Sequence, residues 1–538
     1  MAGFTERRAR REARIEISIF VVLVVLAAVP VFAGRYLPLF DYPAHLAVPA
    51  ALRHRAVPAT RVSQLWTLDL RLVPNSLHYA LTYLGSFAMP LETASRLFVA
   101  LFCIAALPPA AAFLLRTFGR DWRLAALVVP LCWSRCLWYG FIGYCAALPL
   151  SLVVLALLQR DLRRPELRRE AILAALVALL PFVHFFVMVL TLVLAFALVL
   201  AHGVKSTRRA RLWRSVMPLA TGPSMMAPWF LGSLHSGPQP TGGAAAHLFA
   251  SRPRAADYLA LLHHWFIEGY TGRFDDVLAV VIVLTLAALI AYPTRERAAE
   301  IVGAARHSTG ERFIPLVSCA VLGALYFLLP FEIRAPFHWW GMNVRVLPLL
   351  YVWLLVAVPP GRLDGLGRFL LVPAAVTTAA FLIYVAVDVR RTFNGPEGMG
   401  GFDEVVARIP PGSSVLGLYT DYRQPPHYAH YPYHYASCYA VVQGGGVAAP
   451  FIPIPQSWTN PRVVPDYPVA GDAALFQFER HAPGFSHFLV RTCLGDRCVP
   501  DPLEGRAEVR RLAESGRWRL YQCAADPCGA TDATWSPQ

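Results

Sequence analysis

The sequence predicts a polytopic α-helical membrane protein with about eleven spans and a small exported α/β domain at its C-terminus. Three observations predict this class. Hydrophobic residues make up 56% of the 538 residues and charged residues only 15%, against ~25% in an average soluble domain. Long apolar runs recur over residues 1–390. After Asp388 the composition becomes that of a soluble domain.

The apolar runs predict the spans, because a run of about 18 residues is typical of a membrane-spanning helix. The first extends from Ile15 to Gly34. It follows an arginine-rich segment and is long, with no clear cleavage site, which favours a retained signal anchor. Further candidate spans lie near 95–115, 124–137, 139–158, 171–185, 187–203, 215–234, 276–293, 313–331, 345–360 and 369–388.

The net charge of +15 indicates how these spans are oriented. Basic residues cluster in short loops, and with the N-terminus inside, every cluster falls on the cytoplasmic side. The clusters lie at Arg116–Arg123, Arg160–Arg169, Lys205–Arg214, Arg295–Arg312 and Arg362–Arg368. We therefore expect a bacterial inner-membrane protein with a cytoplasmic N-terminus. The basic balance then reflects the bilayer and does not point to nucleic acid.

This topology divides the chain into two domains. Residues 1–390 form the membrane domain, with a long first outer loop at 35–94, and residues 391–538 form an extracytoplasmic domain. Alternating helix and strand signals in the tail predict a small α/β domain. We expect helices at Phe402–Ile409 and Arg506–Glu514, and strands at Ser414–Tyr419, Phe485–Val490 and Trp518–Gln522.

Cysteines are consistent with an exported tail. Two close pairs lie there, Cys493 with Cys498 and Cys523 with Cys528. In an oxidising compartment such pairs predict disulfides, either within each pair or between the pairs. A four-cysteine zinc site is the alternative, and the spacing and the exported location favour disulfides.

Residues 427–439 are rich in His and Tyr. They could form an aromatic surface for sugars, a metal site, or a Tyr-rich loop packed on the membrane domain. No spacing in this segment matches a strong metal signature, so we do not expect a metal here.

Asp41 is the first candidate for chemistry. It follows the first span closely and lies among aromatic residues at interface depth. Partial desolvation there would raise the pKa of the carboxyl toward a value useful for a general base. Asp41 before Tyr42 and Pro43 is equally a good helix N-cap. His45, four residues on, would share its helical face.

Other polar residues are placed at the same side of the membrane by the predicted topology. Arg345 would lie at the outer mouth of a span, where a charged residue is costly and marks a functional candidate, although snorkelling to headgroups is an alternative. Arg135 and His184 lie near the outer ends of their spans, and the loop before Arg345 contains His338 and Trp339. An aromatic belt also accounts for Trp339.

The order of elements resembles the GT-C superfamily of integral membrane glycosyltransferases. Residues Leu39–Leu46 carry the resemblance, with Asp41 at the place of the catalytic carboxylate, and Pro181–His184 supports it. Many relatives have two adjacent acidic residues where this chain has Asp41 and Tyr42. The resemblance implies transfer of a sugar from a polyprenyl-phosphate donor on the outer face, typically with inversion.

In that scheme Asp41 is the general base and Arg345 the leading phosphate ligand, because a phosphate leaves and an acceptor hydroxyl must lose its proton. The remaining candidates for substrate binding are His45, Arg135, His184, His338 and Trp339. Some relatives bind a divalent metal through carboxylates. This chain shows no clear second acidic cluster, so a metal is possible but unsupported by a motif.

Two other classes of protein remain open at this point. A transporter or lipid-handling protein would need polar groups and broken helices near the bilayer midplane. A non-catalytic envelope assembly protein would use its exported domain to bind a partner. The sequence identifies neither the sugar, hexosyl or pentosyl, nor the acceptor, which could be a glycan, a lipid or a protein.

Overall fold

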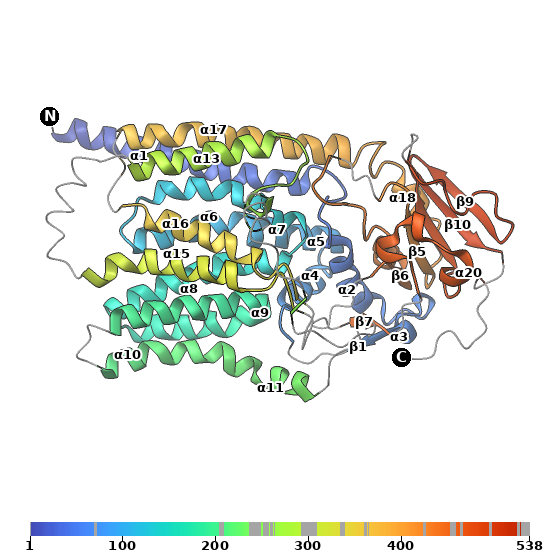
Figure 1. The fold of residues 1–538 in the computed structure, drawn as a ribbon, viewed down its shortest axis with the longest axis horizontal. Helices are drawn as coiled ribbons and strands as arrows, with labels where there is room; N and C mark the ends of the chain where they lie inside the picture. Colours follow the sequence, from blue (N-terminus) through green and yellow to red (C-terminus); the bar gives the residue numbers. More distant parts are fainter. Residues whose placement is uncertain are drawn as a thin grey trace.

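The structure is a computed structural model. It describes residues 2–528 except for 69–72, 204–208, 236–248, 251–257, 259–261, 263, 292–308, 334–338, 360–362, 364, 423–426, 452–458, 463–465, 494–497 and 525–527. A bundle of long, roughly parallel helices forms one part of the molecule, and a β-sheet domain lies at one end of it (Figure 1). Helices α2 and α4 lie between the two parts. We call this end of the bundle the sheet end.

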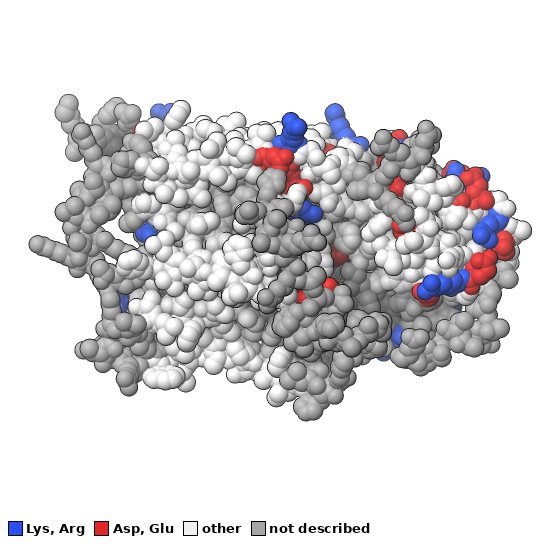
Figure 2. All heavy atoms as spheres, in the orientation of Figure 1, with Lys and Arg blue, Asp and Glu red and all other residues white. Residues whose placement is uncertain are grey.

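The bundle is that of a multi-pass membrane protein. Six helical segments of the described chain are long and apolar enough to cross a bilayer: Arg11–Phe32, Leu91–Thr117, Ile142–Arg163, Leu167–His202, Phe274–Ala291 and Gly365–Phe393. Two shorter apolar helices, Phe313–Leu328 and Val344–Ala357, accompany them. Large apolar side chains face outward, as Val22 at 62% exposure illustrates. On the face shown in Figure 2, most of the bundle is uncharged and charges gather over the sheet domain.

The elements of the membrane domain follow one another with short connections. Its first half contains α1 (Ala2–Phe32), α2 (Tyr42–His54), η1 (Pro58–Thr60), α3 (Val62–Leu65), β1 (Trp66–Leu68), α4 (Leu77–Gly85), α5 (Leu91–Phe98), η2 (Val99–Ala105), α6 (Leu107–Thr117), η3 (Trp122–Trp133), α7 (Arg135–Trp138) and α8 (Ile142–Arg163). Its second half contains α9 (Leu167–Gly203), α10 (Arg209–Val216), η4 (Met217–Ala220), α11 (Thr221–His235), β2 (Phe249–Ala250), α13 (Phe274–Ala291), α15 (Thr309–Leu328), β3 (Glu332–Ile333), β4 (Trp339–Trp340), η6 (Val344–Val346), α16 (Leu347–Ala357), α17 (Gly365–Asp388) and η7 (Val389–Phe393).

The segment predicted as a span at 124–137 is a 3₁₀-helix. Element η3 covers Trp122–Trp133, and a short helix, α7, follows it. A 3₁₀-helix rises about 2.0 Å per residue, against 1.5 Å in an α-helix, so a short apolar run can extend further along the bundle. Asp121 caps its start by accepting a hydrogen bond from the Arg123 N–H at 2.9 Å.

Helix α9 turns back on itself at His184, the one residue of this helix with extended backbone (φ −163°, ψ 116°). His202, near its end, contacts Gln159 of α8 at 3.1 Å. The Glu166 N–H, just before its start, donates to Asp161 of α8 at 3.1 Å. Both ends of α9 therefore lie beside the C-terminal end of α8. The spans predicted at 171–185 and 187–203 correspond to its two arms.

The segment predicted as the first outer loop packs against the C-terminal domain. Helix α2 and Trp66 share a hydrophobic cluster with Cys438 and Val441 of α19 (Cys438–Gly444). Strand β1 pairs antiparallel with β7 (Thr459–Pro461). The Trp66 indole N–H donates to the Gly446 carbonyl at 2.7 Å. Segments almost 400 residues apart thus form one structural unit, as the separation of 380 residues between Trp66 and Gly446 illustrates.

The C-terminal domain contains a five-stranded mixed sheet in the order β6-β5-β8-β10-β9. The strands are β5 (Ser414–Tyr419), β6 (Val447–Ala449), β8 (His487–Arg491), β9 (Val509–Ser515) and β10 (Trp518–Cys523). Strand β5 is parallel to β6 and β8, whereas β10 is antiparallel to β8 and β9. Short helices complete the domain: α18 (Phe402–Val406), η8 (Val469–Gly471), η9 (Ala473–Leu475) and α20 (Phe478–His481).

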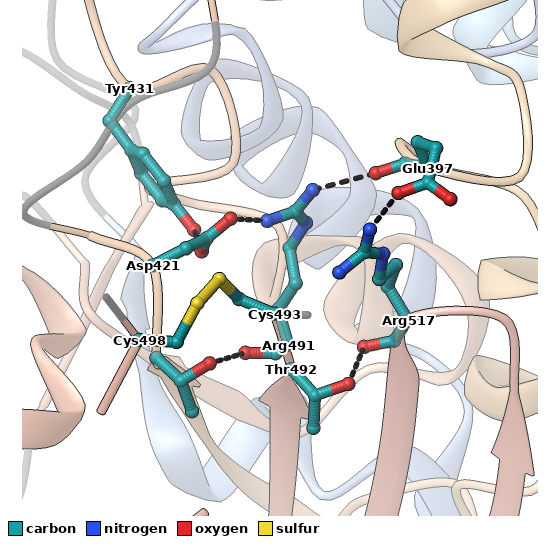
Figure 3. The surroundings of a disulfide bond; sticks show 9 residues. Glu397, Asp421, Tyr431, Arg491, Thr492, Cys493, Cys498 and Arg517 are labelled. Atoms are coloured by element: carbon teal, nitrogen blue, oxygen red, sulfur yellow. Dashed lines mark hydrogen bonds and ion pairs between the residues drawn. A yellow bond between two sulfur atoms is a disulfide. The ribbon is translucent and has the colours of Figure 1, made fainter. Parts of the chain in front are cut away.

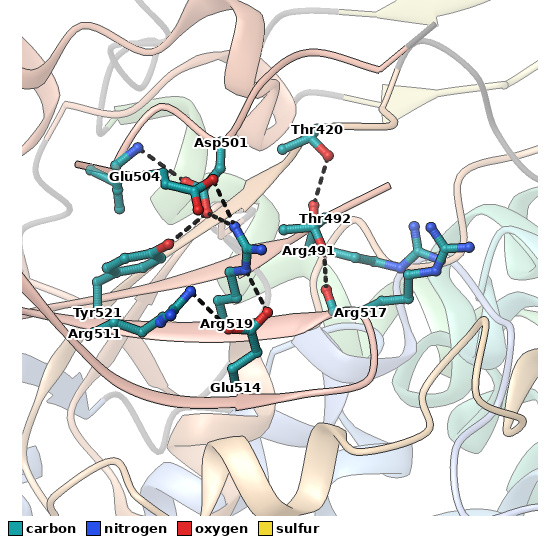
Figure 4. A network of polar contacts seen from close by, with 11 residues as sticks. Thr420, Arg491, Thr492, Asp501, Glu504, Arg511, Glu514, Arg517, Arg519 and Tyr521 are labelled. Carbon is teal, nitrogen blue, oxygen red and sulfur yellow. Dashed lines mark hydrogen bonds and ion pairs between the residues drawn. The ribbon is translucent and has the colours of Figure 1, made fainter. Parts of the chain in front are cut away.

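One predicted element of this domain is wrong. We expected a helix at Arg506–Glu514, but Val509–Ser515 forms the edge strand β9. Pairing with β10 supplies backbone hydrogen bonds that a local helix preference does not outweigh. Arg519 of β10 binds Asp501, Glu504 and Glu514, and the Tyr521 hydroxyl donates to Asp501 at 2.7 Å (Figure 4). These contacts hold the preceding loop on the sheet.

The two close pairs of tail cysteines are each joined within the pair, Cys493 to Cys498 and Cys523 to Cys528. Near the first bond, Arg491 is buried between Asp421 and the Glu397 carbonyl (Figure 3). Its guanidinium lies 3.9 Å from the centre of the Tyr433 ring. Because Tyr433 belongs to the His/Tyr-rich segment, Arg491 connects that segment to the sheet.

Asp388, at the end of α17, connects the same segment to the bundle. Its carboxylate accepts hydrogen bonds from the hydroxyls of Tyr428 at 2.5 Å and Tyr270 at 3.2 Å. His427 contacts the other oxygen at 2.8 Å. Residues 427–439 therefore pack on the membrane domain, as one of the three interpretations of this segment expected.

Candidate active site

Asp41 lies at the sheet end of the bundle, where the chain leaves α1 and enters α2. Two backbone hydrogen bonds fix it to the connection between α7 and α8: Phe40 N–H donates to the Trp138 carbonyl at 2.9 Å, and Asp41 N–H to the Tyr139 carbonyl at 3.2 Å. Asp41 occupies the N-cap position of α2, but its side chain makes no capping hydrogen bond. The carboxylate is thus left available for another role.

The surroundings of this carboxylate favour its protonated form. Its Oδ1 atom is buried and has no hydrogen-bond partner within the described part of the chain. Burial raises the pKa of Asp41 from the ordinary 3.8 to about 7, and the nearby Arg345 opposes this rise. A carboxyl with a pKa near neutrality can exchange a proton with a substrate at physiological pH.

Gly140 gives the chain room to pass Asp41. Its φ is +79°, a conformation that favours glycine, and a Cβ atom at this position would lie 2.8 Å from the Asp41 nitrogen. The aromatic residues Tyr139 and Phe141 flank it. Sequence analysis did not single out Gly140, because its importance depends on a neighbour about 100 residues earlier in the chain.

Arg345 lies at the start of the apolar helix Val344–Ala357, close enough to Asp41 to influence its pKa. Its guanidinium carbon is 4.0 Å from the centre of the Phe141 ring, and its Nη1 is 3.5 Å from His184 Nε2. The Nε atom is buried without a hydrogen-bond partner among the described residues. No described carboxylate forms an ion pair with Arg345, so its donors remain open to an anion.

His184 faces Arg345 from the turn of α9. Its Nδ1 accepts a hydrogen bond from the Val187 N–H at 3.4 Å, which places the proton of the neutral ring on Nε2. Nε2 and the Arg345 Nη1 are then both donors and cannot bond to each other. A shared acceptor, such as the oxygen of an anion, satisfies both groups.

Arg135 is in a different electrostatic state from Arg345. Its Nη1 forms an ion pair with Glu268 at 2.5 Å, and Glu268 also contacts His264 Nδ1 at 2.5 Å. The guanidinium lies over the rings of Tyr139 and Trp265, at 5.5 and 5.3 Å. Arg135 is therefore already neutralised, whereas Arg345 is not.

His45 supports the Asp41 segment. Its Nδ1 contacts the Tyr79 hydroxyl at 2.8 Å, and its ring also bonds to the Gly140 carbonyl. Burial lowers the pKa of His45 to about 4, so the ring is neutral at pH 7. His45 Nδ1 is thus used within the protein, and substrate contact by His45 stays a prediction.

The His/Tyr-rich segment packs on the residues just before Asp41. The His434 ring stacks on Phe40, the residue before Asp41, with centroids 4.5 Å apart. His430 Nε2 contacts the Pro38 carbonyl at 2.8 Å. Sequence analysis noted the segment but had no signal for this position, since the contact joins residues almost 400 positions apart.

The two other predicted substrate contacts are not placed. His338 lies outside the described residues, and of Trp339, in β4, only the backbone is described. In the described ranges no group of three or more His, Cys, Asp or Glu side chains could hold a metal ion. The structure therefore brings together Asp41, Arg345 and His184. His45 lies beside Gly140, and Arg135 lies over the Tyr139 ring.

A bundle of apolar helices with a sheet domain at one end is the arrangement of the GT-C fold, and the chain has this fold. The structure is similar to ArnT from Cupriavidus metallidurans, with a TM-score of 0.53, 13% identity, and coverage of 97% of this chain and 100% of that chain. It is also similar to the arabinofuranosyltransferase AftD from Mycobacteria, with a TM-score of 0.50 and 14% identity.

The AftD match covers 95% of this chain, which spans 42% of the length of AftD. At the level of sequence, no family model and no curated protein matches the chain. The predicted resemblance and fold class are confirmed as a likeness of fold. The count of about eleven spans and the roles of the site residues stay predictions.

Proposed function

We propose that the protein is a glycosyltransferase that moves a sugar from a polyprenyl-phosphate donor to an acceptor hydroxyl at the sheet end of the membrane domain. One observation carries the proposal: the buried Oδ1 of Asp41 lies near Arg345, and among the described residues Oδ1 has no hydrogen-bond partner and Arg345 has no carboxylate partner. A base and an anion site next to each other at the mouth of the spans suit a lipid-linked phosphate donor.

The chemistry assigns a role to each group. The acceptor oxygen bonds to the anomeric carbon, the bond from that carbon to the phosphate oxygen breaks, and Asp41 takes the acceptor proton. The phosphodiester donor becomes a phosphomonoester and gains negative charge as it leaves. Arg345 and His184 donate to that phosphate, and donors aimed at developing charge stabilise the transition state more than the ground state.

The remaining features fit the same reaction. With the base and the phosphate ligand as separate groups, attack from the face opposite the leaving group is the simplest geometry, so we propose inversion. The name of AftD specifies arabinofuranosyl transfer. We therefore include pentosyl as well as hexosyl polyprenyl phosphates among candidate donors, and glycans, lipids and proteins among candidate acceptors.

The transporter alternative receives less support from the positions of the broken elements. A transport site calls for broken helices near the bilayer midplane. The break in α9 lies at the sheet end, where Asn75 of the first outer loop reaches it. A measurement of glycosyl transfer distinguishes the enzyme from the alternative of a non-catalytic assembly protein.

Asp41→Asn tests the proposal. The amide keeps the size of the carboxylate but cannot accept the proton, so we expect transfer to fall by at least 100-fold, the lower end for losing a general base being about 10². Donor consumption and product formation are measured by mass spectrometry with a panel of polyprenyl-phosphate sugars. Asp466→Asn, at an exposed ion pair of the C-terminal domain, is the matched control.

Two outcomes contradict different parts of the proposal. Transfer by Asp41→Asn at the wild-type rate would show that Asp41 is not the base. If the wild-type protein consumes no lipid-linked sugar from the panel with any acceptor class, the enzyme proposal itself is wrong.

A further inference from the structure

The turn of α9 interrupts the regular hydrogen bonding of the helix, and Phe185 and Pro181 form one of the interrupted pairs. In an uninterrupted α-helix the N–H of residue 185 donates to the carbonyl of residue 181. The extended conformation of His184 separates these two groups in this chain. A backbone donor at Phe185 and an acceptor at Pro181 consequently need other partners within an apolar bundle.

Asn75 supplies both partners. Its side-chain Oδ1 accepts a hydrogen bond from the Phe185 N–H at 2.8 Å. Its backbone N–H donates to the Pro181 carbonyl at 3.1 Å. One residue of the first outer loop is thus inserted between the two groups that the helix would otherwise join directly.

The backbone of Asn75 is adapted to this insertion. Its φ is +59°, in the left-handed region that few residues other than glycine adopt. Asparagine tolerates this conformation better than most residues and adds a side-chain acceptor, which glycine lacks. Strained backbone of this kind persists where the surroundings hold it and often lies at functional sites.

The insertion determines where the His184 ring points. With Phe185 held by Asn75, His184 stays extended and its Nδ1 accepts from the Val187 N–H. Nε2 is then directed to Arg345 Nη1, 3.5 Å away. Without the insertion, the Phe185 N–H and the Pro181 carbonyl would lose these partners, and the turn that holds His184 beside Arg345 would rearrange.

We propose that Asn75 is a positioning residue that holds the turn of α9 open and thereby keeps His184 beside Arg345 for the leaving phosphate. The kinetic part of this inference rests on the proposed function, whereas the structural part does not. The first outer loop then carries the base, Asp41, and also fixes the phosphate ligands through Asn75.

Two substitutions at Asn75 and one control isolate the contribution of the side-chain Oδ1 from that of the backbone N–H. Asn75→Gly keeps the left-handed backbone and the N–H but removes Oδ1, and Asn75→Asp keeps an acceptor oxygen. Arg61→Gly is the matched control, because Arg61 is another left-handed residue of the same loop, with a φ of +54°. It lies in the turn between η1 and α3, which caps neither arm of α9.

The first measurement needs no turnover. Hydrogen exchange read by mass spectrometry on peptides covering residues 181–190 should quicken in Asn75→Gly and stay slow in Asn75→Asp and Arg61→Gly. Equal protection of this segment in Asn75→Gly and the wild type would overturn the inference, whatever reaction the protein catalyses.

The second measurement concerns the donor. We expect kcat/KM for the polyprenyl-phosphate sugar to fall in Asn75→Gly on the order of tenfold to a hundredfold, as for a small displacement of catalytic groups. Acceptor KM should be unchanged, and Asn75→Asp should restore most of the loss. His184→Ala combined with Asn75→Gly should lose little more than His184→Ala alone, because both act on the same ring.

The outcomes distinguish this inference from the proposed function. Independent, multiplying losses in the double variant, or an unchanged donor kcat/KM in Asn75→Gly, would show that Asn75 does not act through His184. Absence of transfer by the wild type would instead contradict the proposed function, and hydrogen exchange would still decide the structural role of Asn75.

Discussion

Burial and a neighbouring cation act in opposite directions on the Asp41 carboxyl. Burial raises its pKa to about 7, and Arg345 limits the rise. A general base must be deprotonated, so kcat/KM should be constant above about pH 7 and fall about tenfold for each unit below it. A pH profile of kcat/KM for the donor measures this limb.

Arg345→Gln should move the same limb. Removal of the cation removes the effect that lowers the pKa of Asp41, so the limb should shift to higher pH, in addition to an overall loss of rate. A limb that stays in place or moves to lower pH would show that the titrating group is not Asp41 beside Arg345. Arg480→Gln, at an exposed ion pair of the C-terminal domain, controls for a general charge effect.

At the scale of single elements, two glycines in different connections form a matched pair: Gly140 lies between α7 and α8, and Gly119 lies between α6 and η3. Gly140 and Gly119 have φ of +79° and +71°, so alanine at either position is strained by roughly 1–2 kcal/mol. A Cβ at Gly140 would meet Asp41, whereas a Cβ at Gly119 would meet nothing within 4 Å. We expect Gly140→Ala to reduce transfer strongly and Gly119→Ala to leave it near the wild-type level.

Thermal unfolding of both variants completes this comparison. Similar unfolding temperatures together with different rates would attribute the effect to Asp41. Equal rates for Gly140→Ala and Gly119→Ala would contradict the position of Asp41 described here.

The elements predicted correctly are those whose signal is local. The strand expected at Ser414–Tyr419 coincides with β5, because a run of buried residues between turn signals needs no distant partner to be recognised. The helix expected at Arg506–Glu514 failed because β10 recruits that segment into the sheet. Charged side chains are typical of an edge strand, and the same run of charges in a sequence is also typical of an exposed helix.

The same distinction applies to the candidate site. The predicted topology alone placed Asp41, His184 and Arg345 at one end of the bundle, since the basic clusters, predicted to lie on the other side, order the spans. Asn75 could not be found in this way. Its role depends on a helix break more than 100 residues later, and no local pattern around Asn75 records that partner.

For the whole molecule, the orientation expected from the arginine clusters can be tested with one residue. Lys205 is the one lysine of the chain and belongs to a cluster predicted to face the cytoplasm. A membrane-impermeant amine reagent applied to intact cells should not label it. Labelling should occur after introduction of Arg510→Lys, an exposed residue of β9, because we expect the C-terminal domain to lie outside.

Permeabilised cells provide the positive control, since Lys205 should react once the reagent can enter. Labelling of Lys205 in intact cells, or protection of the lysine at position 510, would reverse the predicted orientation and place Asp41 on the cytoplasmic side.

The pairing of β1 with β7 has a consequence for the time course of synthesis. Trp66 can bond to Gly446 only after the ribosome has added a further 380 residues. At roughly 5–20 residues per second this takes about 20–80 seconds. During that interval the early spans are already inserted, while α2 lacks the partners that cover it. Maturation of the loop that carries Asp41 is therefore a late event, and a chain that stalls before its last strands lacks the contacts between this loop and the C-terminal domain.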